Sequence, residues 1–103
     1  PRFIDLSGDA ARAAAQGVAG SVSSATSIYY AARKASNAAA TYTIGGCTDV
    51  NTNIGSLLAG GLPSGYTVTG AGTCTDGNTT TCTVTNTNVT PSQAASAVIV
   101  CAL

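Results

Sequence analysis

The sequence predicts an α+β domain in which a long N-terminal helix forms a spine packed on a small antiparallel β-sheet, stabilised by disulfides. Three observations support this fold class. Small and apolar residues recur at helical spacing over 1–36, residues alternate with the period of a strand over parts of 66–103, and all four cysteines follow the helix. We expect one domain over 1–103, with a loop and a short helix over 37–65 between the long helix and the strands.

The composition excludes several classes of function. Charged residues make up 8% of the 103 residues, the formal net charge is zero, and Glu, His, Met and Trp are absent. Side chains therefore cannot form a basic patch that binds a phosphate backbone. Acid or base chemistry would depend on four Asp, the Tyr residues and one Lys, and there is no histidine to activate the many serines. We expect no enzyme, no cofactor and no small-molecule substrate.

The first 36 residues predict one amphipathic helix whose stripe consists mostly of small residues. The stripe comprises Phe3, Leu6, Ala10, Ala13, Ala14, Gly17, Val18, Ser21, Val22, Ala25, Ile28, Tyr29 and Ala32. A continuous helix of this length would be about 52 Å long, whereas a compact domain of this size is roughly 33 Å across. One end should therefore protrude unless the helix breaks near Gly8, and a protruding helix favours a subunit of an assembly.

Several residues of this helix are candidates for packing between subunits. Glycine destabilises a helix interior by about 1 kcal/mol relative to alanine. The presence of Gly17 and Gly20 in this helix is easier to explain if another backbone comes close to them. Half of the charged residues lie three or four apart near the start, as Arg2, Asp5, Asp9 and Arg12. They form either ion pairs within the helix, Arg2–Asp5 and Asp9–Arg12, or pairs between subunits. The candidate packing residues are Arg2, Phe3, Asp5, Leu6, Asp9, Arg12, Gly17 and Gly20.

A short helix is expected between the long helix and the strands, with Thr48 or Asp49 as its cap. Its apolar side would consist of Val50, Ile54, Leu57 and Leu58. The pattern Asp49-x-Asn51-x-Asn53 resembles the start of a calcium loop. Its glycine comes one place late, at Gly55, and no acidic residue closes the loop, so a helix cap is the preferred interpretation and no metal is expected.

Alternating segments and a turn predict an antiparallel meander in the second half of the chain. Tyr66–Thr69 and Cys82–Thr85 alternate, and the intervening Asp76-Gly77 is a strong turn signal. A third strand is expected near Ala95–Leu103. Threonines would lie on one face of this sheet, and the long helix would cover the other. The exposed loop at the tip of the hairpin would comprise Thr75, Asp76, Gly77, Asn78 and Thr79.

Four cysteines in so short a chain predict two disulfides formed in an oxidising compartment, and therefore export. The cysteines are Cys47, Cys74, Cys82 and Cys101. A zinc site is disfavoured because their spacings are wide and no histidine is present. If the first strand ended near Cys74 and the second began at Cys82, local geometry would favour the pairs 74–82 and 47–101. The pairs 47–82 and 74–101 are the other possibility that we consider.

Two segments of the chain resemble the soluble part of type IV pilins. Pro1–Leu6 and Asp9–Arg12 are similar to the junction at which the apolar half of the pilin helix ends in a proline. Ser56–Val68 is similar to pilins of the type IVa group, including those of mannose-sensitive haemagglutinin pili. The resemblance extends over nearly the whole chain in the order of its elements. It implies a major pilin that lacks the N-terminal hydrophobic half of its helix.

The resemblance also implies a disulfide pairing, a location and partners. Family members often pair a cysteine of the loop after the helix with one in the sheet, which slightly favours 47–82 with 74–101. Helices would bundle at the centre of an extracellular filament on a bacterial cell surface. Before assembly the subunit would be anchored in the inner membrane through a missing apolar segment with a methylated first residue, which would contact the pilus assembly machinery.

The expected function is that of a structural subunit of a type IV pilus, which polymerises non-covalently for adhesion, twitching motility or DNA uptake. Two alternatives stay open. A pseudopilin of a type II secretion system commonly carries a calcium site, which the sequence does not show. An exported module that binds a glycan or a surface would need an exposed aromatic platform, whereas we expect most of the tyrosines to pack in the core or between helix and sheet. They are Tyr29, Tyr30, Tyr42 and Tyr66.

Overall fold

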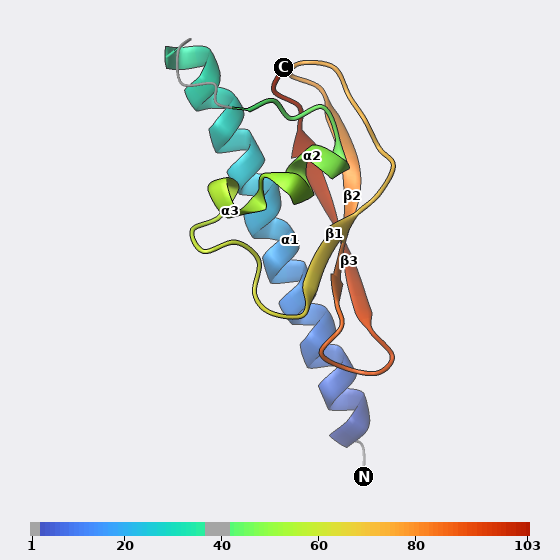
Figure 1. Ribbon diagram of the computed structural model, residues 1–103. Coiled ribbons are helices and arrows are strands. Elements are labelled where there is room, and N and C mark those ends of the chain that lie inside the picture. The colour runs from blue at the N-terminus through green and yellow to red at the C-terminus, as the bar shows by residue number, and fades with distance from the viewer. Residues whose placement is uncertain (1–2, 37–41) are drawn as a thin grey trace.

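The computed structural model of the chain describes residues 3–36 and 42–103, apart from the side chains of residues 3–7 and 36. One long helix packs on a three-stranded antiparallel sheet, and two short helices lie beside them (Figure 1). The elements are α1 (Phe3–Ser36), α2 (Cys47–Thr52), α3 (Ile54–Leu57), β1 (Tyr66–Thr69), β2 (Thr79–Asn86) and β3 (Gln93–Val100). The predicted α+β class, with a helix packed on a small antiparallel sheet and two disulfides, is confirmed.

Helix α1 is continuous over 34 residues, and Gly8 does not interrupt it. The segment is rich in alanine, the best helix former, and Arg33 and Lys34 in the last turn complement the negative end of the helix dipole. The molecule measures 55 × 24 × 17 Å along its principal axes. A helix of this size is about 51 Å long, so α1 sets the length of the molecule. Its N-terminal turns extend beyond the sheet, as predicted (Figure 1).

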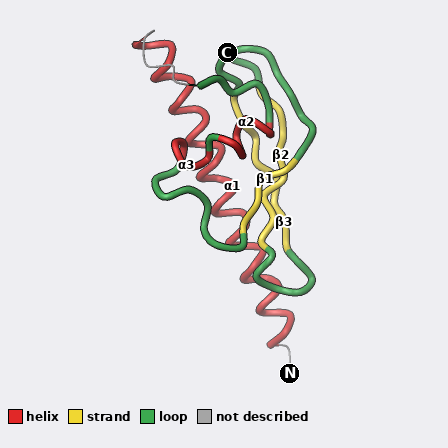
Figure 2. Tube along the Cα trace, in the orientation of Figure 1, coloured by secondary structure: helices red, strands yellow, loops and turns green. Residues whose placement is uncertain are grey.

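The sheet is a meander in which strand order follows chain order, β1-β2-β3 (Figure 2). β2 pairs with β3 over its whole length, from Thr79 opposite Val100 to Asn86 opposite Gln93. β1 is shorter and pairs only with the C-terminal half of β2. β2 is therefore the central strand, and the outer edges of the sheet belong to β1 and β3.

The segment before α2 pairs with two stretches of chain beyond the strand ends, one after β3 and one between β1 and β2. Ile44 and Ala102 exchange two backbone hydrogen bonds of 2.8 and 2.9 Å. Gly46 forms a bridge with Thr73, where its missing side chain is required, because a Cβ at this position would lie 2.4 Å from the carbonyl oxygen of Gly72. The chain between α1 and the sheet is therefore held by backbone pairing as well as by its disulfide.

The core lies between one face of the sheet, one face of α1, and α2. The sheet contributes Val68, Cys82, Val84, Ala97 and Ile99, and α1 contributes Ala11, Ala15, Ala19, Val22 and Thr26, all of them buried. Each fully buried valine or isoleucine stabilises the fold by roughly 1.5–3 kcal/mol. Two hydrogen bonds join the layers, from Asn86 Nδ2 to the Ala11 carbonyl (3.3 Å) and from the Val100 N–H to Thr26 Oγ1 (3.1 Å).

The face of α1 that packs on the sheet differs from the predicted stripe. Ala11, Ala15 and Thr26 are buried although the stripe did not include them. Seven residues of the predicted stripe are instead exposed: Ala10, Ala13, Ala14, Gly17, Ser21, Ile28 and Ala32. Alanine is the commonest residue on the buried face, and alanine, serine and glycine make up most of the exposed one. The hydrophobic pattern therefore could not identify the face that meets the sheet.

The ends of the short elements also differ from the predictions. One short helix was expected, with a side chain as its cap, but the structure has α2 and α3 in succession, and Gly46 precedes α2 without any side-chain capping bond. Asp49 instead accepts a hydrogen bond of 2.7 Å from the backbone N–H of Gly45. The strands β2 and β3 begin earlier than predicted, at Thr79 and Gln93.

Candidate functional site

Two disulfides join the second half of the chain, and within the described residues no cysteine is free. Cys47–Cys82 links the first residue of α2 to the middle of β2, and Cys74–Cys101 links the loop before β2 to the residue after β3. This is the pairing that the resemblance implied. The exposed Gly70 lies directly against the first bridge, since a Cβ at this position would be 3.2 Å from Cys47 Sγ.

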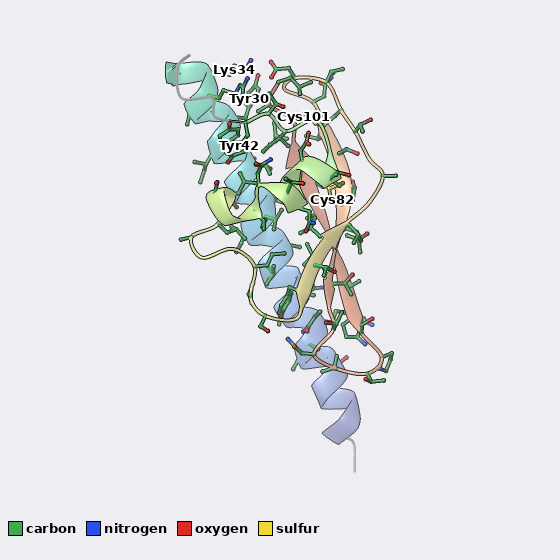
Figure 3. The ribbon with its side chains drawn as sticks, in the orientation of Figure 1. Tyr30, Lys34, Tyr42, Cys82 and Cys101 are labelled. Carbon is green, nitrogen blue, oxygen red and sulfur yellow. A yellow bond between two sulfur atoms is a disulfide. The ribbon has the colours of Figure 1, made fainter. Side chains whose placement is uncertain are left out.

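The pairing that local geometry favoured, 74–82 with 47–101, is not the one found. It assumed that the first strand runs to Cys74 and that the second begins at Cys82. β1 ends at Thr69, and Cys82 lies in the fourth position of β2, opposite Ala97. The intervening chain runs past α2 toward the end of β3, and this brings Cys74 to Cys101 (Figure 3).

The predicted exposed loop is exposed from Thr75 to Asn78, and Thr79 is the first residue of β2. Asp76 anchors this loop. Its Oδ2 forms an ion pair of 2.6 Å with Lys34 Nζ at the end of α1, and its Oδ1 accepts a hydrogen bond of 2.9 Å from the N–H of Leu103. The hydrogen bond from Lys34, followed by that from the Leu103 backbone, lowers the pKa of the Asp76 carboxyl. The loop is thus fixed to α1 and to the last residues of the chain.

A cluster of aromatic and basic residues surrounds the same end of α1 (Figure 3). The rings of Tyr29 and Tyr42 stack with their centroids 4.4 Å apart. The Tyr29 hydroxyl and Arg33 Nη1 both donate to the backbone carbonyl of Tyr42, at 2.5 and 2.6 Å. Burial, followed by the proximity of Tyr29, raises the pKa of Tyr42. These contacts hold the segment that enters α2 against the end of the helix.

The tyrosines do not form the flat aromatic surface that a glycan-binding module would use. Tyr29 and Tyr42 cover one another, and Tyr30 lies against Gly77 and below the ammonium of Lys34, which is 5.5 Å from its ring centre. Tyr66 is half-buried and packs against the core. All four tyrosines therefore take part in packing.

The exposed face of α1 is a continuous surface of small residues. Its members recur at steps of three and four: Ala10, Ala14, Gly17, Ser21, Ser24, Ile28, Ala31 and Ala35. Ile28 is the exception in size and is 69% exposed. Among the described residues, no atom outside the local helix lies within 4 Å of the positions that a Cβ would occupy at Gly17 or Gly20. Packing within the described chain therefore does not explain these two glycines.

The charged residues predicted at the start of the helix are only partly described. Arg2 lies outside the described residues, and Phe3, Asp5 and Leu6 lie in α1 with side chains that are not described. Asp9 and Arg12 are both exposed. The expected ion pair between them is not formed; in the described part of the chain the ion pair is Lys34–Asp76. Sequence reasoning missed that pair, although Asp76 and the basic end of the helix were each noted.

Two shallow hollows lie between α2 and the chain that follows β1, on either side of Thr48. Their linings are neutral except for Asp49, whose carboxylate already accepts the Gly45 N–H. Over residues 3–36 and 42–103 there is no group of three His, Cys, Asp or Glu placed to hold a metal ion. None of the helices formed by the described residues is long and apolar enough to span a membrane.

No known protein family, curated protein or solved structure gives a significant match to this chain. The candidate site is therefore defined by geometry alone. It has two parts: the exposed small-residue face of α1, and the end of the molecule at which Asp76 and Cys101 join the loop, the helix and the last residues of the chain.

Proposed function

We propose that the chain is a structural subunit of a type IV pilus, of the type IVa major-pilin group, that polymerises non-covalently through α1. The observation that carries this proposal is the small-residue face of α1, which is exposed along the helix and includes Gly17, a glycine that packing among the described residues does not explain. Small residues let two helix backbones approach closely, and their three-and-four spacing suits helices packed at a small angle. Such a surface fits a bundle of helices at the centre of a filament.

Three further features support the same proposal. The N-terminal turns of α1 extend beyond the sheet, where they are available to neighbouring subunits (Figure 1). The two disulfides fit an exported protein that works outside the cell. The outward face of the sheet carries threonines and no charged residue, which fits the solvent-facing side of a filament. In this proposal copies of the chain are its main partners, and the assembly machinery is contacted through a preceding apolar segment.

The proposed role is tested by mass spectrometry of filaments sheared from the source cells. We expect abundant peptides of this chain, preceded by an apolar segment that begins with a methylated residue. Finding the protein only in the envelope or the medium would contradict the proposal. It would favour the alternatives, a pseudopilin of type II secretion or a free surface-binding module.

A variant of the protein as it occurs in the source cells tests the helix face itself. Gly17→Leu should abolish or strongly reduce filaments because the larger side chain keeps neighbouring helices apart. Gly55→Leu is the matched control, since Gly55 in α3 is also exposed with no atom within 4 Å of a Cβ. Equal filament yields from the two variants would show that this face of α1 does not form the contact between subunits.

A further inference from the structure

The chain contains two sequences of the type Asn-x-Thr, which is the acceptor for N-linked glycans in exported proteins. They are Asn78-Thr79-Thr80 and Asn88-Val89-Thr90. The first also has Asp76 two places before its asparagine, although the chain has only four acidic residues in all. It therefore offers a transferase a carboxylate and a hydroxyl to bind, one on either side of the amide that would react.

The side chain of Asn88 is already used by the fold. Its Nδ2 donates to the carbonyl of Ser64 (3.1 Å), and its backbone N–H donates to Asn86 Oδ1 (3.0 Å). The same side chain lies against Gly65, where a Cβ would be 2.8 Å from Asn88 Nδ2. A sugar on this nitrogen would therefore displace the side chain from the turn before β1.

Asn78 is held by its backbone, and its side chain is at the surface. The N–H of Asn78 donates to the carbonyl of Thr75 (3.0 Å), and its carbonyl accepts the N–H of Cys101 (2.9 Å). The exposed side chain donates from Nδ2 to the hydroxyl of Thr75 in the same turn, which is exposed as well. A group added to Nδ2 thus disturbs a contact at the surface and none in the core.

We propose that Asn78 is the attachment site of an N-linked glycan, which a transferase moves from a lipid-linked oligosaccharide diphosphate. A bond forms between Nδ2 and the anomeric carbon of the first sugar, and the bond from that carbon to the donor phosphate oxygen breaks. The lipid diphosphate leaves with the electron pair of the broken bond, and one Nδ2 proton passes to a base of the transferase. The second proton stays on Nδ2, so the amide keeps a donor.

The folded chain holds the groups on both sides of this asparagine, so the transfer has to precede the last steps of folding. Asp76 is bound by Lys34 (2.6 Å) and by the N–H of Leu103 (2.9 Å). Thr80 belongs to β2, and its hydroxyl lies against Gly72, where a Cβ would meet it. β3 and Leu103 follow the acceptor in the chain and emerge after it when export proceeds from the N-terminus. The acceptor is therefore open until β3 pairs with β2.

The position of Asn78 in the molecule accommodates a bulky substituent. Its loop lies beside the last turn of α1, at the end opposite the N-terminal turns that extend beyond the sheet (Figures 1 and 3). A glycan at this end adds hydrated surface to a chain in which only 8% of the residues are charged. It leaves the N-terminal turns of α1 uncovered, as the proposed filament contact requires.

Mass spectrometry of the full chain purified from the source cells tests the site. We expect electron-transfer fragmentation to locate an added mass of hexose or N-acetylhexosamine units on Asn78 and none on Asn88. Asn78→Gln should remove this mass. An unmodified Asn78 in the wild-type chain overturns the proposal. An added mass that persists in Asn78→Gln overturns it as well, because that mass would belong to a hydroxyl group.

Substitutions at the hydroxyl position test recognition of the acceptor. Thr80→Val keeps the shape of the side chain and should reduce the occupancy of Asn78 at least tenfold, whereas Thr80→Ser should retain it. Thr79→Val is the matched control, and equal occupancy in the two valine variants overturns the proposal. Circular dichroism must show that all three variants keep the wild-type fold. The glycan goes beyond the proposed filament role, which is tested by the presence of the chain in filaments whether or not Asn78 is modified.

Discussion

Asp76 joins three parts of the molecule through one carboxylate. It pairs with Lys34 of α1, accepts the backbone N–H of Leu103, and belongs to the loop that Cys74 anchors to Cys101. Since the hydrogen bond from Lys34 lowers the pKa of Asp76 in the folded chain, the charged form of this side chain is favoured by folding. The stabilisation is present above the ordinary carboxyl pKa of about 3.9. It is lost as the pH falls through the lower pKa of the folded state.

Asp76→Asn should therefore change the pH dependence of unfolding. Asparagine keeps an oxygen for the Leu103 N–H but loses the charge. We expect the wild-type chain to melt at a higher temperature than the variant near pH 7, and the difference to close as the pH falls from about 5 toward 2. Thermal melts across this range give the result. Asp9→Asn, at an exposed position without an ion pair to Arg12, should show a much smaller difference, and an equal one would contradict the role of Asp76.

At the scale of single elements, α1 keeps glycines that weaken it. Gly17→Ala should raise the free energy of unfolding of the chain by up to about 1 kcal/mol, because alanine favours the helix and its Cβ meets no other atom. Gly46→Ala is the contrasting variant. Its Cβ would lie 2.4 Å from the Gly72 carbonyl oxygen, so we expect a loss of roughly 1–3 kcal/mol.

Chemical denaturation of the two alanine variants distinguishes these cases. A stabilised Gly17→Ala chain would mean that the glycine is retained for something other than the stability of the isolated subunit. A destabilised Gly17→Ala chain would show instead that the position is constrained within the subunit. That outcome would weaken the evidence for helix contacts between copies.

The sequence identified the long helix but not its buried face. Length, small-residue spacing and the basic last turn are local signals, and they suffice for a helix over nearly the predicted range. Burial depends on the sheet, which is formed by distant residues. Ala11 and Ala10 have the same side chain, and only the hydrogen bond from Asn86 and the packing of the sheet make the first of them the buried one.

The strands show a similar division between local and distant information. Alternation located β1 and the centre of β2, but not the early start of β2 at Thr79 or the loop that carries Cys74 away from β1. That loop is positioned by backbone pairing of Gly46 with Thr73, which no local pattern signals. For the same reason the argument from strand ends gave a disulfide pairing that the structure does not have.

At the scale of the whole molecule, we expect the two disulfides to contribute unequally to the free energy of unfolding. They close loops of similar size, with sequence separations of 35 and 27, so the loss of either should cost about 3.5–4 kcal/mol from loop entropy alone. Cys47 and Cys82 are both 1% exposed and belong to the core cluster, whereas in the second bridge Cys101 is buried outside that cluster and Cys74 is half-buried. Removing the first bridge therefore also creates a defect in the core.

Cys47→Ala/Cys82→Ala should accordingly destabilise the chain more than Cys74→Ala/Cys101→Ala, by roughly 1–3 kcal/mol. Guanidinium unfolding of the two double variants, compared with the wild-type chain, measures this difference. Titration of thiols in the denatured, unreduced wild-type chain should find essentially none free. A larger loss from the second pair would mean that the anchoring of the loop to Cys101 matters more than the core.

Neither disulfide includes α1, and this has a mechanical consequence. Both bridges lie within residues 47–101, so the sheet, α2 and the loop before β2 form one covalently closed unit. The helix is attached to this unit by packing, by hydrogen bonds, by the Lys34–Asp76 ion pair and by the chain that follows it, but by no disulfide. Tension applied along the helix axis would act on the contacts of Ala11, Ala15, Ala19 and Val22, whose side chains are small. We expect the helix then to separate from the sheet from its first buried turn onward, while the disulfide-closed unit keeps its shape and allows the helix to re-form on it.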